Sequence, residues 1–99
     1  MKEEFARQGD ILFERVDKIP EGAKQLDHRI VARGEATGHT HTITAPGRLW
    51  EWNGEVFVEA PGEVMVEHQE HGVGTLTPGI WKVVHQEEPT PLGLRHVSD

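Results

Sequence analysis

The sequence predicts an all-β fold, a single small barrel or sandwich of about eight short strands. Its apolar residues form short runs that recur roughly every 8 to 12 residues between glycine and proline turns. No stretch has the apolar period of an amphipathic helix. The length of 99 residues predicts one β-barrel domain over residues 1–99, with an N-terminal arm at 1–8 and a proline-rich C-terminal tail at 88–99.

Turn residues bound the first three predicted strands. An apolar run at 11–16 stops at the turn signal of 19–22, which contains proline and glycine. The segment 26–32 alternates loosely and predicts a second strand. The bend at 34–38 begins and ends with glycine, and the His-x-His segment at 39–43 that follows it is the third strand.

The strongest local signal is the Asn53-Gly54 pair, because both residues tolerate the positive φ of a tight hairpin turn. It predicts that the segments 49–52 and 55–59 are the two strands of a hairpin. Glycine and proline turns separate the remaining predicted strands, which lie at 64–68, 80–87 and, as a short edge strand of the tail, 94–97.

Charge and composition exclude several functions. The net charge of -7 arises from 17 acidic against 10 basic residues, and the bases are scattered, so a nucleic-acid partner is not expected. The absence of cysteine excludes disulfides and thiolate metal sites. There is no apolar run long enough to cross a membrane and no secretory signal at the start, which predicts a cytoplasmic location.

The most informative segment is Gly34-Glu35-Ala36-Thr37-Gly38-His39-Thr40-His41-Thr42-Ile43. Residues two apart on a strand point to the same face, so His39 and His41 share a face with Ile43. Because an apolar residue marks the buried face, both imidazoles are expected to point inward. A paired imidazole of this kind is a typical beginning of a metal site in a β-protein.

Two later strands add further candidate ligands. His68 continues the apolar row of the strand at 64–68, and His85 continues the apolar row of the strand at 80–87. His71 follows shortly after His68, beside a glycine, so either residue is a candidate for the third ligand, with His68 preferred. The predicted metal ligands are therefore His39, His41, His68, His71 and His85.

Imidazole ligands favour a divalent transition metal such as Zn, Fe, Mn or Ni. A site with three protein nitrogens leaves positions for water, oxygen or substrate, so it is suited to catalysis. The candidate acid, base or ligand-orienting carboxylates are Glu35, Glu70 and Glu87. The alternative is that some or all of these histidines are ordinary residues hydrogen-bonded to the backbone or exposed on the surface.

Trp50 and Trp52 lie two residues apart beside the predicted hairpin turn, so they share one face of their strand. Such a face can stack on a sugar or a base, or it can contact a protein partner. The alternative is that both side chains belong to the core or to an interface.

Several positions resemble the two sequence motifs of the cupins, small β-barrels whose His-x-His and a distant histidine bind a metal. The matching residues are Gly34, His39 and His41 in the first motif, and Gly72, Pro78-Gly79 and His85 in the second. The resemblance spans residues 34–85 and implies a double-stranded β-helix with His39, His41 and His85 as ligands. The chain has Ala45-Pro46 where the first motif has its glutamate, and His85 lies later than the second motif places its histidine.

The chain also resembles a group of short bacterial and phage proteins that share a GExTGHxH motif. The matching segments are Arg7-Gln8-Gly9-Asp10, Gly34-Glu35 with Thr37-Gly38-His39-x-His41, and Pro78-Gly79 leading to Gln86-Glu87. This resemblance implies a common fold and no particular activity.

Two classes of function follow from these observations. The first is a histidine-based, transition-metal-binding barrel, acting as a metal-dependent enzyme on a small molecule. The second is a non-enzymatic phage or bacterial accessory module that binds a protein through a sheet edge or the tryptophan face, with the metal structural or absent. In either class a homodimer is the expected assembly, because a small barrel with exposed edges gains stability by pairing.

Overall fold

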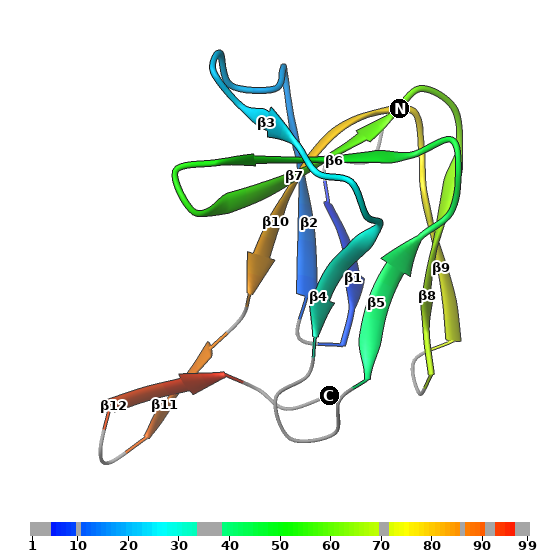
Figure 1. Cartoon of the computed structure of the whole chain (residues 1–99). Coiled ribbons are helices and arrows are strands. Elements are labelled where there is room, and N and C mark those ends of the chain that lie inside the picture. The colour runs from blue at the N-terminus through cyan, green and yellow to red at the C-terminus, as the bar shows by residue number, and fades with distance from the viewer. Residues whose placement is uncertain are drawn as a thin grey trace.

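The computed structural model describes residues 5–9, 11–33, 39–69, 72–85, 87–90 and 93–96. These residues form strands, turns and bends without a helix, which confirms the predicted all-β class. Two antiparallel sheets pack together as a small sandwich, with a radius of gyration of 13.4 Å (Figure 1). Of the two predicted architectures, barrel and sandwich, the arrangement of the sheets corresponds to the sandwich.

The larger sheet is antiparallel and brings the beginning of the chain next to its later part. In spatial order, its strands are β1 (Phe5–Gln8), β2 (Ile11–Val16), β10 (Gly79–His85), β7 (Glu55–Ala60), β6 (Arg48–Trp52) and β3 (Lys24–Gln25). The pairing of β10 with β2 joins residues that are far apart in sequence, such as Val83 and Phe13. Strands β1 and β3 form the two edges of this sheet.

The smaller sheet is also antiparallel. In spatial order, its strands are β4 (Ile30–Arg33), β5 (Thr40–Ile43), β8 (Val64–His68) and β9 (Gly72–Leu76). The register between β4 and β5 shifts between Ile30 and Ala32. Val31 and Ala32 are both buried beside this irregularity, although adjacent residues of a regular strand point to opposite faces.

After β10 the chain forms an antiparallel hairpin of two strands, β11 (Glu87–Thr90) and β12 (Gly93–His96). This hairpin lies apart from both sheets in Figure 1. The predicted strand of the tail at 94–97 therefore corresponds to β12, which pairs with β11 rather than with an edge of the sandwich.

The hydrophobic core lies between the two sheets, and its largest fully buried side chain is Trp81. Strands of both sheets contribute to it because alternate residues point inward, as in β8, where Val64, Val66 and His68 are buried and the residues between them are exposed. The buried apolar cluster is Ile11, Phe13, Val31, Ala32, Ile43, Leu49, Val58, Ala60, Val64, Val66, Leu76, Trp81 and Val83.

The predicted hairpin at 49–59 is confirmed. Asn53 and Gly54 have φ values of 54° and 79°, and β6 and β7 pair on either side of them, with Trp52 opposite Glu55. These positive φ values are the geometry of a two-residue hairpin turn, which asparagine and glycine adopt at little cost.

The described residues contain twelve strands rather than about eight. Strand β1 lies within the N-terminal arm predicted at residues 1–8. Strand β9 follows His68, in a glycine-containing stretch for which no strand was predicted. The predicted strand at 26–32 is replaced by two short strands, β3 and β4, which belong to different sheets. Strands β1 and β9 pair with their neighbours in the chain, β2 and β8, whereas β3 pairs with the distant β6. Only the last of these pairings is hidden from local patterns.

Candidate functional site

Three of the predicted ligands meet at one end of the smaller sheet. Strands β5 and β8 are neighbours, and the pairs Thr42 with Glu67 and Ile43 with Val66 bring His41 level with His68. The ring centres of His41 and His68 are 4.3 Å apart. The ring centre of His39, which precedes β5, is 5.5 Å from that of His68, with the two planes at 89°. We refer to His39, His41 and His68 as the histidine cluster.

The histidine cluster is largely removed from solvent. His41 and His68 are 1% and 6% exposed, and His39 is half-buried. The Nδ1 atom of His39 and the Nε2 atom of His68 are buried. This burial confirms that the His-x-His strand and the row of β8 point inward, as the alternating pattern predicted.

Gln8 at the end of β1 connects the larger sheet to the histidine cluster. Its side chain is buried, and its Nε2 donates hydrogen bonds to the backbone oxygens of Val66 (2.9 Å) and Gly72 (3.1 Å). Its Oε1 lies 2.8 Å from Nδ1 of His41. Gln8 therefore ties β1 at the edge of one sheet to β8, β9 and β5 of the other.

These contacts determine the tautomer of His41. Both hydrogens of the Gln8 amide nitrogen are directed to carbonyl oxygens, so the amide oxygen must be the atom that faces His41. Because a carbonyl oxygen only accepts, Nδ1 of His41 must donate its hydrogen to it. In the neutral ring Nε2 then holds the lone pair.

Gln8 was not among the site residues predicted from the sequence. The only signal for it was its place in the Arg7-Gln8-Gly9-Asp10 segment that the chain shares with the short bacterial and phage proteins. A glutamine has no pattern that predicts burial, and its partners are 33 to 64 residues away in the sequence.

A polar cavity of about 340 Å³ lies on the outer face of the smaller sheet, on the other side of β5 and β8 from the buried rings of His41 and His68. It is lined by Thr40, Thr42, Glu67, His68 and Gln69. The Thr40 backbone N–H donates a hydrogen bond of 3.0 Å to Oε1 of Gln69, which connects the two walls. Hydroxyl, amide and carboxylate groups therefore surround a space next to His68. Such a lining is suited to a small polar molecule.

The other predicted site residues lie elsewhere or outside the described part of the chain. In β10 the first members of the expected inward row, Trp81 and Val83, are buried, but His85 at the end of the strand is exposed. His85 belongs to the larger sheet and pairs with Ile11 of β2. Three predicted residues lie outside the described part of the chain: Glu35, Glu70 and His71. Glu87 begins β11, and nothing is described of its side chain.

Within the described ranges, no group of three or more histidine, aspartate or glutamate side chains is arranged to hold a metal ion. The imidazoles of the histidine cluster contact one another through their rings, with planes tilted by 38° between His41 and His68. Their nitrogens do not converge on one point in this arrangement.

Trp50 and Trp52 lie on the outer face of the larger sheet, as expected for residues two apart on β6. Trp50 is half-buried, and its Nε1 donates a hydrogen bond of 3.0 Å to Oε1 of Glu59. Trp52 is 41% exposed. Neither tryptophan belongs to the buried core cluster between the sheets.

Comparison with protein families gives one match. The family described as a domain of unknown function (DUF8820) matches residues 7–86. The searches of curated proteins and of solved structures found no match. No helix in the described part of the chain has the length and apolar character needed to span a membrane.

Proposed function

The chain belongs to the DUF8820 family, a family of domains of unknown function, and we propose from the geometry of the histidine cluster that it binds a transition-metal ion through His39, His41 and His68. The observation that supports this proposal best is the contact between Gln8 and His41. Histidines that bind metals almost always donate their second ring N–H to a fixed acceptor, which orients the ring and sets its tautomer. Gln8 supplies such an acceptor to His41.

The spacing of the rings is close to that of imidazoles on a shared ion. An ion bonded to nitrogen at about 2.0–2.1 Å lies roughly 3.2 Å from the ring centre, so two imidazoles on a tetrahedral or octahedral ion have centres roughly 4.5–5.2 Å apart. The separations of 4.3 Å and 5.5 Å lie on either side of this interval. Metal binding therefore requires the rings to turn about their side-chain torsions, without a change in the pairing of the strands.

The chemistry of the ligands restricts the ion. With no cysteine in the chain, an imidazole site favours Zn, Fe, Mn or Ni. Three nitrogen ligands leave at least one position for water or substrate. A metal-dependent reaction on a small polar molecule is therefore part of the proposal.

The exposed position of His85 places it outside the proposed ligand set, in contrast to the implication of the cupin resemblance. His39 and His41 correspond to the first cupin motif, and His68 takes the place of the third ligand. The variants His68→Ala and His85→Ala therefore distinguish the two ligand sets.

The test is the metal content of protein purified without an affinity tag, measured by elemental analysis. We expect near-stoichiometric metal in the unmodified protein and in His85→Ala, and a loss of metal in His41→Ala and His68→Ala. His28→Ala is the matched control, because His28 is exposed and lies between β3 and β4. Circular dichroism and tryptophan fluorescence must show that the variants are folded.

Two outcomes would contradict the proposal. If the unmodified protein holds no metal and takes up none when Zn, Fe, Mn and Ni are added, the histidine cluster is a structural element of the core. If metal is lost equally in His28→Ala, the ion is bound nonspecifically. In the first case the accessory-module hypothesis takes its place, with the outer face around Trp52 as the surface to test.

A further inference from the structure

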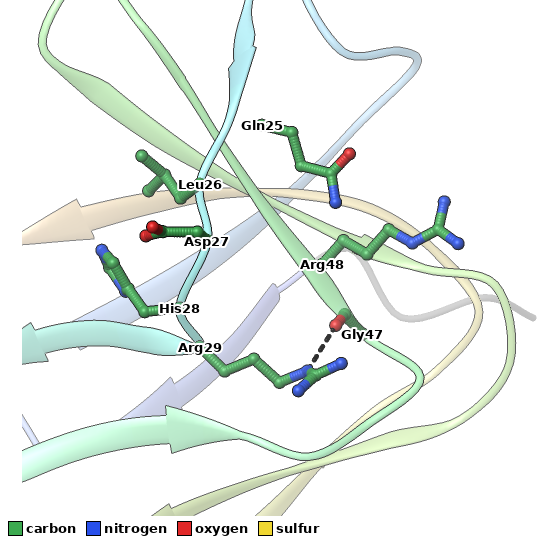
Figure 2. Close-up of a pocket in the computed structure, with 7 residues that line it drawn as sticks. All are labelled: Gln25, Leu26, Asp27, His28, Arg29, Gly47 and Arg48. Carbon is green, nitrogen blue, oxygen red and sulfur yellow. Dashed lines mark hydrogen bonds between the residues drawn. The ribbon is translucent and has the colours of Figure 1, made fainter.

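A second cavity, of about 160 Å³, lies between the β3–β4 connection and the start of β6 (Figure 2). It is separate from the histidine cluster and from the cavity beside His68. Its lining consists of Gln25, Leu26, Asp27, His28, Arg29, Gly47 and Arg48. Two of these seven residues are arginines, in a chain whose net charge is -7.

The arrangement of the side chains separates the charges. In Figure 2, Gln25, Arg29 and Arg48 extend toward one side of the connecting segment, while Asp27 and His28 extend toward the other. Two guanidinium groups and an amide therefore lie on the same side of the site. The carboxylate of Asp27, which would repel an anion, lies away from them.

The guanidinium of Arg29 is held by one nitrogen only. Its Nε donates a hydrogen bond of 3.0 Å to the backbone oxygen of Gly47. The terminal nitrogens of Arg29 and the whole guanidinium of Arg48 make no hydrogen bond or ion pair with the residues that the structure describes. A hydrogen bond through Nε fixes the plane of the group and leaves both terminal N–H₂ groups to bind a ligand.

The backbone that supports the cavity is hydrogen-bonded to both sheets. Leu26 N–H donates to the backbone oxygen of Leu49 (2.8 Å), and the backbone oxygen of Arg29 accepts from Ile43 N–H (3.0 Å). The cavity walls are therefore attached to β5 and β6. A preorganised site of this kind does not lose conformational entropy in its backbone when a ligand binds.

The carbonyl that holds Arg29 is also fixed. Gly47 N–H donates to the backbone oxygen of Thr44 (3.0 Å). A Cβ at Gly47 would lie 2.9 Å from Cδ1 of Ile43 and 3.0 Å from the backbone oxygen of Thr44. The turn therefore packs directly against the core, and the Gly47 carbonyl has a defined position relative to the two arginines.

We propose that this cavity binds a small dianionic oxyanion, a phosphate group, through Arg29 and Arg48. Two guanidinium groups match the charge of a dianion, and their paired N–H donors match its oxygens. The volume is well below the roughly 300–1,000 Å³ of pockets that enclose whole drug-sized ligands, so the site has room for one anionic group. The amide of Gln25 supplies a further donor on the same side.

The experiment is a titration of the metal-free protein with inorganic phosphate in the presence of EDTA, followed by calorimetry and by the shift in Tm. Removal of metal keeps any phosphate from binding to an ion in the histidine cluster, so this test is independent of the proposed function. We expect saturable binding with a Kd of about 1 mM or tighter. Arg29→Gln and Arg48→Gln should each weaken binding about tenfold or more.

The matched control is Arg7→Gln, which makes the same change in charge on β1, at the opposite edge of the larger sheet from β3. It should bind phosphate as the unmodified protein does. Sulfate should compete with phosphate, and acetate, with a single charge, should bind more weakly. A parallel titration with glycerol phosphate determines whether the source of the group is free phosphate or a phosphate ester.

Either of two results would overturn the proposal. One is the absence of saturable phosphate binding up to about 20 mM, a concentration at which even a weak specific site would be largely occupied. The other is an equal loss of binding in Arg7→Gln, Arg29→Gln and Arg48→Gln, which would show that the overall charge of the protein determines the interaction. Circular dichroism of each variant distinguishes loss of the site from loss of the fold.

Discussion

The side-chain oxygen of Gln8 lies 2.8 Å from Nδ1 of His41, and both side chains are buried. This contact connects β1, at the edge of the larger sheet, with β5, an inner strand of the smaller one. It closes one side of the sandwich with a polar pair rather than with apolar side chains. It also fixes the tautomer of His41, with the hydrogen on Nδ1.

Replacing Gln8 by alanine should lower the stability of the protein. The change removes a buried partner of His41 Nδ1 and of the Val66 carbonyl, and a partly buried partner of the Gly72 carbonyl. We expect a loss of about 2–3 kcal/mol in the free energy of unfolding, since buried polar groups without partners each cost about 1–3 kcal/mol. Urea denaturation measures it, with the exposed Gln25→Ala as control. Equal stability of the two variants would contradict this role of Gln8.

The same substitution tests the orientation of the proposed ligand. If His41 binds a metal through Nε2, then Gln8→Ala should reduce metal affinity by about 10- to 100-fold, because outer partners of ligating histidines have effects of this size. The measurement is a competition titration with a chelator of known affinity, carried out where the variant is fully folded. An unchanged affinity would mean that His41 is not a ligand, or that Gln8 does not orient it.

Gly79 occupies a position that only glycine fits. Its φ is 146°, and a Cβ there would overlap Nη1 of Arg15, whose guanidinium lies over the Trp81 ring at 4.3 Å from the ring centre. Gly79→Ala should therefore displace Arg15 from Trp81 and from the Pro78 backbone oxygen that it contacts at 2.8 Å. With the backbone strain included, we expect a loss of about 1–3 kcal/mol.

The matched control for this variant is Gly62→Ala, because a Cβ at Gly62 meets nothing within 4 Å. Chemical denaturation should find Gly62→Ala within about 0.5 kcal/mol of the unmodified protein. If Gly79→Ala is equally neutral, the backbone at Gly79 is more tolerant than its φ and its contact with Arg15 indicate.

The two exposed-face tryptophans should differ in their contribution to stability. Trp50→Phe removes the hydrogen bond from Nε1 to Glu59, which is made to a charged group, so we expect a loss of about 1–2 kcal/mol. Trp52→Phe, at a side chain that is 41% exposed, should change stability by less than about 0.5 kcal/mol. Thermal or urea unfolding measures both variants, and equal effects would show that the hydrogen bond of Trp50 contributes nothing.

The ion pair between Lys82 and Glu55 on the outer face, with a distance of 2.7 Å, should contribute weakly and depend on pH. The hydrogen bond to Glu55 raises the pKa of Lys82 above its ordinary value of 10.5. Because the folded pKa is raised, the stabilisation is complete below the unfolded pKa and is lost as the pH rises through the folded one.

The variant that tests this pair is Glu55→Gln. The side chains of Lys82 and Glu55 are 32% and 39% exposed, so solvent screens the pair, and we expect a loss of about 0–1 kcal/mol near neutral pH. The difference from the unmodified protein should shrink in about 1 M salt and at alkaline pH. A difference that grows as the pH rises above 10.5 would have the wrong sign for this ion pair.

Where the signal was local, the sequence predicted the structure well. The hairpin at Asn53-Gly54 depends on the φ preferences of two adjacent residues, and it formed as predicted. The inward row of β8, ending in His68, follows from the period of two in a strand. The same rule failed for His85, because the pattern shows which residues share a face but not where along the strand the buried region ends.

The sequence by itself determined the all-β class, several strands and turns, and the inward direction of His41 and His68. These properties depend on residues close together in the chain, through φ preferences and the alternation of side chains. Only the tertiary structure decided that β1 closes the sandwich, that Gln8 contacts His41, and that Arg29 and Arg48 share a cavity. These depend on strand pairings and hydrogen bonds between distant segments, which form only when the whole fold brings them together.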